Sequence, residues 1–306
     1  MSGISYGSIP CPPPGIYPNM AFEEYCQIDA LNHTRLRRMA RSPRHFRFPP
    51  PDALTESKNT GTAFHELYLE PDRFHSRVIL GPINERTGKC FGHDTKAWGE
   101  VVAANPGKLV VSKETMEELR GLGAEFSADE DIQSILAHPD AMREVTLIWD
   151  DPPAPIGVGT GLRCKCKLDL FVPFMLRADI KTSEKSVAPG AWVHSAEKFG
   201  YITQDGMYGL ACGALAPMFP QLARKNGKPL ESYFLAGELE GPAHGVAIYE
   251  WDEATLKASR ALVQEWMLKV KRCTDGDEWP GYQKGPQKVK APDYWLRSFV
   301  DDETEG

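Results

Sequence analysis

The sequence predicts an α/β fold, in which a central mixed β-sheet of about five strands is flanked by helices and preceded by a helical N-terminal part. Short segments in which apolar and polar residues alternate predict the strands, and longer segments with helical spacing separate them. The 306 residues are 42% hydrophobic and 25% charged, which is ordinary for a globular protein with a sizeable core. We find no internal repeat and no clear linker, so we expect one folded domain over residues 20–283.

The composition excludes several classes of protein. No run of about eighteen apolar residues is present, so we expect no membrane span, and the N-terminus lacks the features of a secretory signal. The seven cysteines are scattered and form no Cys-x-x-Cys motif, which argues against a zinc ribbon and favours a reducing, cytoplasmic compartment. A formal net charge of −7 argues mildly against a nucleic-acid partner, although a local basic groove matters more than the total.

The first part of the chain is expected to be irregular and then helical. Residues 1–19 are rich in Pro and Gly and are predicted to be disordered or extended. A helix is predicted over residues 20–28. After it, Asn32 or Thr34 can cap a second helix that stops before Pro43.

A run of arginines begins in this second helix and is interleaved with apolar residues. It allows two interpretations, a flank that binds phosphates or a surface helix that pairs with acidic neighbours. Because such runs are common on solvated helix faces, the sequence leaves both interpretations open. In the first, the arginines assigned to substrate binding are Arg35, Arg38 and Arg41.

The middle of the chain is predicted to alternate helices with strands. A strong helix runs from about Gly61 to Glu70 and ends at Pro71. It contains His65, which taken alone is interpreted as an ordinary histidine rather than a metal ligand. The elements expected next are a strand over 109–111, a helix capped by Ser112, a helix that ends at Pro139, and a strand over 144–150.

Residues 161–183 are predicted to form a β-hairpin with an unusual polar pattern. Because side chains alternate faces along a strand, Asp169 on the first strand can meet Asp179 and Lys181 of the second on one solvated side. The opposite side carries apolar residues such as Leu168 and Ile180. The alternative interpretation is a solvated strand face with cross-strand ion pairs.

The chemistry of these three side chains indicates metal-dependent phosphodiester cleavage. Two close carboxylates repel each other unless a cation lies between them, and oxygen-rich sites of this kind suit Mg²⁺ or Mn²⁺. A cation in such a site activates a water molecule at neutral pH. Lys181 can orient that water or stabilise the charge that builds on the phosphate.

The last third of the chain is predicted to begin with a pair of helices broken near Gly200. In the second of them, Gln204 and Tyr208 stand four residues apart and share one face. Strands over 232–238 and 245–251 follow, and then a long amphipathic helix that begins at Asp252. Residues 284–306 are expected to form a polar tail.

Several of these motifs occur in the order found in a known family. The chain contains the helix GTAFHELYLEP, a strand that begins at Glu144, and then KCKLD, DIKTS and YITQDGMY. This ordered set resembles the RecE-type exonucleases (exonuclease VIII), within the PD-(D/E)xK and RecB-like nuclease superfamily. The N-terminal helices and WPGY at 279–282 are also similar to that family. Leu168 and Lys167 depart mildly from its pattern, and residues 87–97 match it poorly.

The resemblance implies a PD-(D/E)xK restriction-endonuclease-like core and a role for each matching residue. The residues that would bind Mg²⁺ or Mn²⁺ are His65, Asp169, Asp179 and the carbonyl of Ile180. Lys181 would be the catalytic lysine, and Glu144 would support catalysis from the preceding strand. Gln204 and Tyr208 would help to hold the substrate.

The resemblance further implies a Mg²⁺-dependent deoxyribonuclease, most similar to an exonuclease that resects double-stranded DNA ends for recombination. Its expected partners are DNA ends and a single-strand annealing protein, and its expected assembly is a ring-shaped homo-oligomer. Two alternatives stay open, an endonuclease or nickase of the same superfamily and a DNA-binding scaffold subunit that does not cut. The intact set of Asp169, Asp179 and Lys181 counts against the scaffold.

Overall fold

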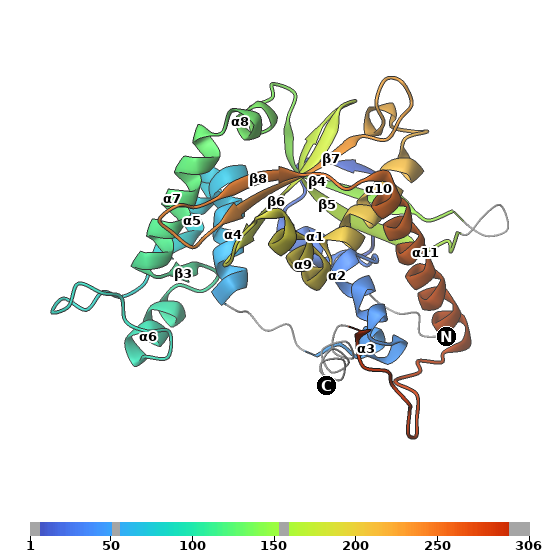
Figure 1. Cartoon of the computed structure of the whole chain (residues 1–306), viewed down its shortest axis with the longest axis horizontal. Coiled ribbons are helices and arrows are strands. Elements are labelled where there is room, and N and C mark those ends of the chain that lie inside the picture. The colour runs from blue at the N-terminus through green and yellow to red at the C-terminus, as the bar shows by residue number, and fades with distance from the viewer. Residues whose placement is uncertain (1–6, 51–55, 153–158, 294–306) are drawn as a thin grey trace, which may run out of the picture.

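A six-stranded mixed sheet forms the centre of the protein (Figure 1), which confirms the predicted fold class. The computed structural model describes residues 7–50, 56–152 and 159–293. The sheet has the order β1-β4-β5-β6-β7-β8, and a separate two-stranded sheet pairs β2 with β3. The strands are β1 (Gly15–Tyr17), β2 (Val78–Leu80), β3 (Leu109–Val111), β4 (Met142–Asp150), β5 (Arg163–Val172), β6 (Leu176–Ser183), β7 (Glu231–Glu238) and β8 (Val246–Tyr249).

The helices lie around this sheet and along the N-terminal part. The helices before β4 are α1 (Phe22–Gln27), α2 (His33–Leu36), α3 (Pro43–Arg47), α4 (Glu56–Leu69), α5 (Pro71–Arg77), α6 (Lys96–Ala104), α7 (Lys113–Ala128) and α8 (Glu130–Leu136). The later helices are α9 (Pro189–Phe199), α10 (Tyr201–Leu215) and α11 (Glu253–Gly276), and two 3₁₀ helices cover Arg37–Ala40 and Pro220–Leu222. Within the described ranges, no helix has both the length and the apolar character needed to cross a bilayer.

Two large apolar clusters cover the two faces of the sheet. One packs α10, α11 and the N-terminal helices against β4 and β5, and the other packs α4, α7 and α8 against β6 and β7. Figure 1 shows α4, α5 and α7 together on one side of the molecule and α10 with α11 on the other. The central strands are therefore buried on both faces, so the periodicity seen in the sequence cannot mark a solvated face.

Several sequence predictions hold at the level of single residues. The Asn32 side chain accepts the Arg35 N–H at the start of α2, and the Asp252 side chain caps α11. The break between α9 and α10 is at Gly200, whose φ of +79° lies in the left-handed region that glycine adopts readily.

Other elements differ from the prediction. Gly15–Tyr17, expected to be part of a disordered or extended segment, pair with β4 as the edge strand β1, while residues 1–6 lie outside the described ranges. Pro71 does end α4, but it also begins α5, because proline is well tolerated in the first turn of a helix. Residues 78–80 form β2, which was not predicted. Of the predicted polar tail, residues 294–306 lie outside the described ranges.

The prediction of a solvated face on β5 is wrong. Lys165 is only 2% exposed, and its ammonium group donates to the carbonyl oxygens of Tyr25 and Ile28 at 2.5 and 2.9 Å. Lys167 donates to the carbonyl of Met20 at 2.9 Å. The chain around α1 therefore covers this face, and the two ammonium groups satisfy carbonyl oxygens within that helix and on either side of it.

Candidate active site

The site lies where β5 and β6 separate. The ladder between them pairs Val172 with Leu176 and Leu170 with Ala178, and it ends there. Beyond this point β5 continues beside β4, and β6 continues beside β7. Asp169 and Asp179 are the next two residues and face each other across this opening. The backbone N–H of Ile180 donates to Asp169 Oδ2 at 2.8 Å, which holds that carboxylate at the edge of β6. The hairpin thus brings the two aspartates together, as the sequence predicted.

His65 reaches the opening from α4. Its Nε2 lies 2.7 Å from the carbonyl oxygen of Ile180, and its Nδ1 lies 3.5 Å from Asp169 Oδ2. With Nε2 donating to the carbonyl, Nδ1 keeps a lone pair for a cation. Burial first, and then the charge of Lys181, lowers the pKa of His65 to about 4, so the ring is neutral at pH 7.

Glu144 reaches the site from β4 with an unusual backbone conformation. Its φ of +54° lies in the left-handed region, which a residue with a side chain occupies at a cost in energy. Lys167 donates to its carbonyl oxygen at 2.8 Å and lies 3.3 Å from its Oε2. Ligand atoms of Glu144, His65 and Asp169 lie within 4.8 Å of one another. Glu144 therefore lies among the possible metal ligands, whereas the resemblance implied only a supporting role for it.

Of the two carboxylate oxygens of Asp179, one has hydrogen-bond donors and the other has none in the described ranges. Its Oδ2 accepts from Lys181 Nζ at 2.8 Å and from Gln204 Nε2 at 2.7 Å. Its Oδ1 is buried and has no hydrogen-bond partner among the residues that the structure describes. A buried acceptor without a donor is costly, and a cation would satisfy it.

The two aspartates of the site have pKa values that are shifted in opposite directions. Burial, and then the neighbouring charge of Asp179, raises the pKa of Asp169 well above its usual range. Burial alone would raise the pKa of Asp179, but Lys181, with smaller contributions from Asp169 and His65, turns the net direction downward. The pKa of Lys181 is raised because the two aspartates outweigh its burial. One imidazole nitrogen and several carboxylate oxygens can therefore hold a divalent metal ion, and they suit Mg²⁺ or Mn²⁺.

Gln204 and Tyr208 lie on one face of α10, as their spacing predicted. The Gln204 amide that holds Asp179 also lies 2.8 Å from the Tyr208 hydroxyl. The helix that carries them is tied to β6 by a buried ion pair between Arg177 and Asp205. The contact of both residues with substrate stays a prediction. The contact seen in the structure is the one from Gln204 to Asp179, and it orients that carboxylate.

The three arginines assigned to substrate binding have different surroundings. Arg35 and Arg38 are half-buried and have partners, whereas Arg41 is exposed. None of them is among the residues that meet at the opening of the hairpin. Their role as phosphate contacts therefore stays a prediction.

Two residues beside the site were not predicted. His33, the first residue of α2, lies 2.9 Å from the hydroxyl of Thr203, the neighbour of Gln204. Burial first, and then nearby cations including Lys181, lowers the pKa of His33 to about 3, so it is neutral. The ring of Tyr201 lies 4.9 Å from Lys181 Nζ and packs over it. Tyr201 is part of the quoted YITQ motif, but nothing in its spacing marked it as a neighbour of the lysine.

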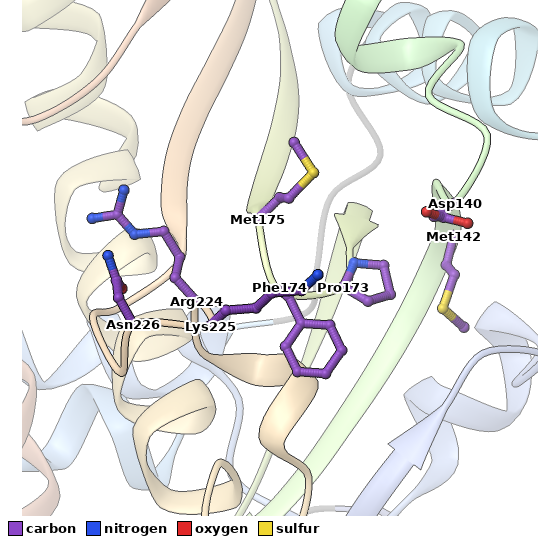
Figure 2. Close-up of a pocket in the computed structure, with 8 residues that line it drawn as sticks. All are labelled: Asp140, Met142, Pro173, Phe174, Met175, Arg224, Lys225 and Asn226. Carbon is purple, nitrogen blue, oxygen red and sulfur yellow. The ribbon is translucent and has the colours of Figure 1, made fainter.

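A pocket elsewhere in the protein is distinct from this site. It has a volume of about 770 Å³ and lies at the turn between β5 and β6, where Pro173, Phe174 and Met175 line it together with Arg224 (Figure 2). It is lined by none of the carboxylates described above. The chemistry of the hairpin opening, rather than the size of this pocket, identifies the candidate active site.

His65 offers a direct test of the metal site. If it binds the ion, His65→Ala should raise the metal concentration needed for half-maximal activity by about tenfold or more. The lost hydrogen bond to Ile180 should reduce the free energy of unfolding by only about 1 kcal/mol. His75→Ala, at an exposed histidine of α5, is the matched control. A large loss of stability with an unchanged metal requirement would show that His65 is only a packing residue.

Comparisons with known proteins agree with this fold. The family model described as "PDDEXK-like domain of unknown function (DUF3799)" matches residues 34–291. A solved structure of a candidate exonuclease from Eubacterium rectale is 12% identical, with 89% of this chain and 93% of that chain covered and a TM-score of 0.54. The structure of SSO0001, also 12% identical, covers 78% of this chain and 82% of its own with a TM-score of 0.27, too low to support an argument. No curated protein matches the sequence.

Proposed function

Since the chain belongs to the family of PDDEXK-like domains of unknown function (DUF3799), we propose that it is a metal-dependent deoxyribonuclease. We further propose that it acts as an exonuclease that resects double-stranded DNA ends for recombination, as the resemblance to the RecE-type enzymes implies. The observation that carries the proposal is the convergence of His65, Glu144, Asp169, Asp179 and Lys181 at one opening in the sheet. The PD-(D/E)xK part of the sequence prediction is confirmed, and the RecE-type part stays a prediction.

In this proposal the metal ion is held by His65, Glu144, Asp169 and Asp179, with the carbonyl of Ile180 beside them. A divalent ion bound there supplies Lewis acidity toward a phosphate oxygen and a water nucleophile. We assign Mg²⁺ or Mn²⁺ because carboxylate oxygens dominate the set.

The remaining residues act by position and charge. Lys181 stays protonated beside Asp179 and can donate to the scissile phosphate or to the attacking water. Tyr201 packs over its ammonium group and keeps it near that carboxylate. Gln204 also donates to Oδ2 of Asp179, which leaves Oδ1 of this aspartate available for the ion.

End dependence separates the exonuclease from its alternatives. Direct reading of bases needs an element that enters a groove, and no such element is recognisable in the described ranges. We therefore expect cleavage to need a DNA end and to ignore sequence. With Mg²⁺, a linear duplex should be degraded to mononucleotides or short products plus residual single strand, whereas a closed circular duplex should survive. Without Mg²⁺, both should survive.

The same assay identifies the other two candidates. Discrete fragments or nicks from the closed circle would favour an endonuclease or nickase of this superfamily. Tight binding without cleavage in either Mg²⁺ or Mn²⁺ would favour a scaffold subunit. A matched control is Lys181→Met, which removes the ammonium group while keeping an unbranched side chain beside Tyr201.

The proposal also covers the assembly, the partner protein and the compartment. By the same resemblance we propose a ring-shaped homo-oligomer and a single-strand annealing protein as partner. Light scattering on the purified protein measures the assembly directly. All seven cysteines are free thiols, which supports the proposal of a reducing, cytoplasmic compartment.

A further inference from the structure

Three arginines and two exposed aromatic rings lie on or beside α3, far in sequence from the carboxylates of the site. We call this group the arginine–aromatic surface and define it by Arg41, Arg44, Arg47, Phe48 and Tyr282. Phe48 is 62% exposed and Tyr282 is 65% exposed. The guanidinium groups of Arg44 and Arg47 lie 6.0 and 5.6 Å from the centre of the Phe48 ring. Exposed aromatic rings grouped with arginines offer a ligand both stacking faces and positive charge.

The two segments that build this surface are fixed to each other. Trp279 stacks on the buried ring of Phe46 with ring centres 5.8 Å apart, and the Arg44 N–H donates to the carbonyl of Pro280 at 3.1 Å. The ring of Tyr282 packs on His45 at 5.2 Å. The WPGY segment is therefore attached to α3, and it presents Tyr282 in a defined position beside the arginines.

The three arginines of this surface carry positive charge that no acidic side chain in residues 7–50, 56–152 and 159–293 pairs with. Arg41, Arg44 and Arg47 form no ion pair with any residue in the described ranges, although surface arginines elsewhere in the chain do, as in the pair of Arg163 with Asp150. The acidic residues nearest in sequence to Trp279 are Asp277 and Glu278, and the first of them accepts from the indole N–H of Trp279 at 3.4 Å. A net positive surface attracts a polyanion.

A short run of helices links this surface to the candidate active site. It begins at α2, where His33 contacts Thr203 beside Gln204, and continues through the 3₁₀ helix to α3. Figure 1 shows α2 below the sheet and α3 farther away from it. A strand that leaves the site along these helices would reach Phe48 and Tyr282.

We propose that the arginine–aromatic surface binds single-stranded DNA, and this deepens the proposed nuclease function on which it rests. The arginines would contact phosphates, and the rings of Phe48 and Tyr282 would stack on bases. Stacking selects a single strand, because the base faces of a duplex are already covered by neighbouring bases. The surface would therefore hold the single strand that remains after one strand of a duplex is removed.

The test is DNA binding by the intact protein in excess EDTA, where no metal-dependent cleavage occurs. Fluorescence anisotropy compares an oligo-dT strand of about twenty nucleotides with a duplex of the same length. The double variant Phe48→Ala/Tyr282→Ala should bind the single strand about tenfold or more weakly, and the duplex within about twofold of wild type. Phe48→Trp/Tyr282→Phe keeps both rings and should bind like wild type. Phe22→Ala, at a phenylalanine that is 49% exposed on α1, is the matched control.

The outcomes separate this proposal from the nuclease proposal. Equal losses for single strand and duplex, or no loss in the double variant, would overturn the stacking surface even if the wild-type protein degrades linear DNA. A selective loss of single-strand binding would support the surface even if no cleavage were found. Replacing the three arginines by Gln should also flatten the salt dependence of binding, and an unchanged salt slope would count against phosphate contacts.

Discussion

Asp169→Asn and Asp179→Asn should each lower the rate of DNA cleavage by about a thousandfold or more. Each change removes a charge from the set proposed to hold the metal, and metal-based stabilisation of a phosphate transition state is worth several kcal/mol. The fold should survive, because asparagine has nearly the same shape as aspartate. For Asp169→Asn, the midpoint of thermal unfolding without metal should equal or exceed that of wild type, since the change removes repulsion between two buried carboxylates.

The measurement is the initial rate on linear duplex at saturating Mg²⁺, together with thermal unfolding in EDTA. Asp150→Asn is the matched control, because Asp150 lies on neighbouring β4 but is exposed and pairs with Arg163. It should leave the rate within about twofold, as surface changes usually do. Near-normal cleavage by folded Asp179→Asn would remove that residue from the active site.

Arg177→Ala should cause the largest loss of stability among single changes near the site, about 3–5 kcal/mol. The guanidinium group of Arg177 lies 2.5 Å from Asp205 Oδ1 and also donates to the Asp205 carbonyl at 3.2 Å, and Asp205 is only 1% exposed. The Ser232 hydroxyl shares the same carboxylate oxygen at 2.5 Å. Removing the arginine leaves a buried charge without its cation, and it loosens α10, which carries Gln204.

Urea unfolding of wild type and variant measures this loss. Arg163→Ala is the matched control, because its pair with Asp150 is partly exposed and should contribute less than about 1 kcal/mol. If the two variants lost the same stability, the buried pair would not hold α10 on the sheet.

The central pattern of the site could be predicted from the sequence because it is local. Period-two alternation on one hairpin was enough to bring Asp169 together with Asp179 and Lys181, and helical spacing was enough to place Gln204 beside Tyr208. Helix caps such as Asn32 were also predictable, because a cap depends on residues three positions apart.

What could not be predicted depends on contacts between distant segments. The burial of Lys165 follows from the packing of α1 on β5, which are about 140 residues apart, and alternation cannot show which strand face another segment covers. The left-handed backbone of Glu144 leaves no sequence signal, since glutamate has no preference for that region. The two histidines beside the site, His33 and His65, are both placed by contacts to residues more than a hundred positions away.

The central claim is that the opening between β5 and β6 binds a divalent metal ion. The most direct test is a calorimetric titration of the purified, EDTA-stripped protein with Mn²⁺, compared with Asp169→Asn and with the control Asp150→Asn. We predict saturable binding by wild type and by the control, and at least a tenfold loss of affinity in Asp169→Asn. Equal Mn²⁺ binding by all three proteins, or no binding by wild type, would contradict the account.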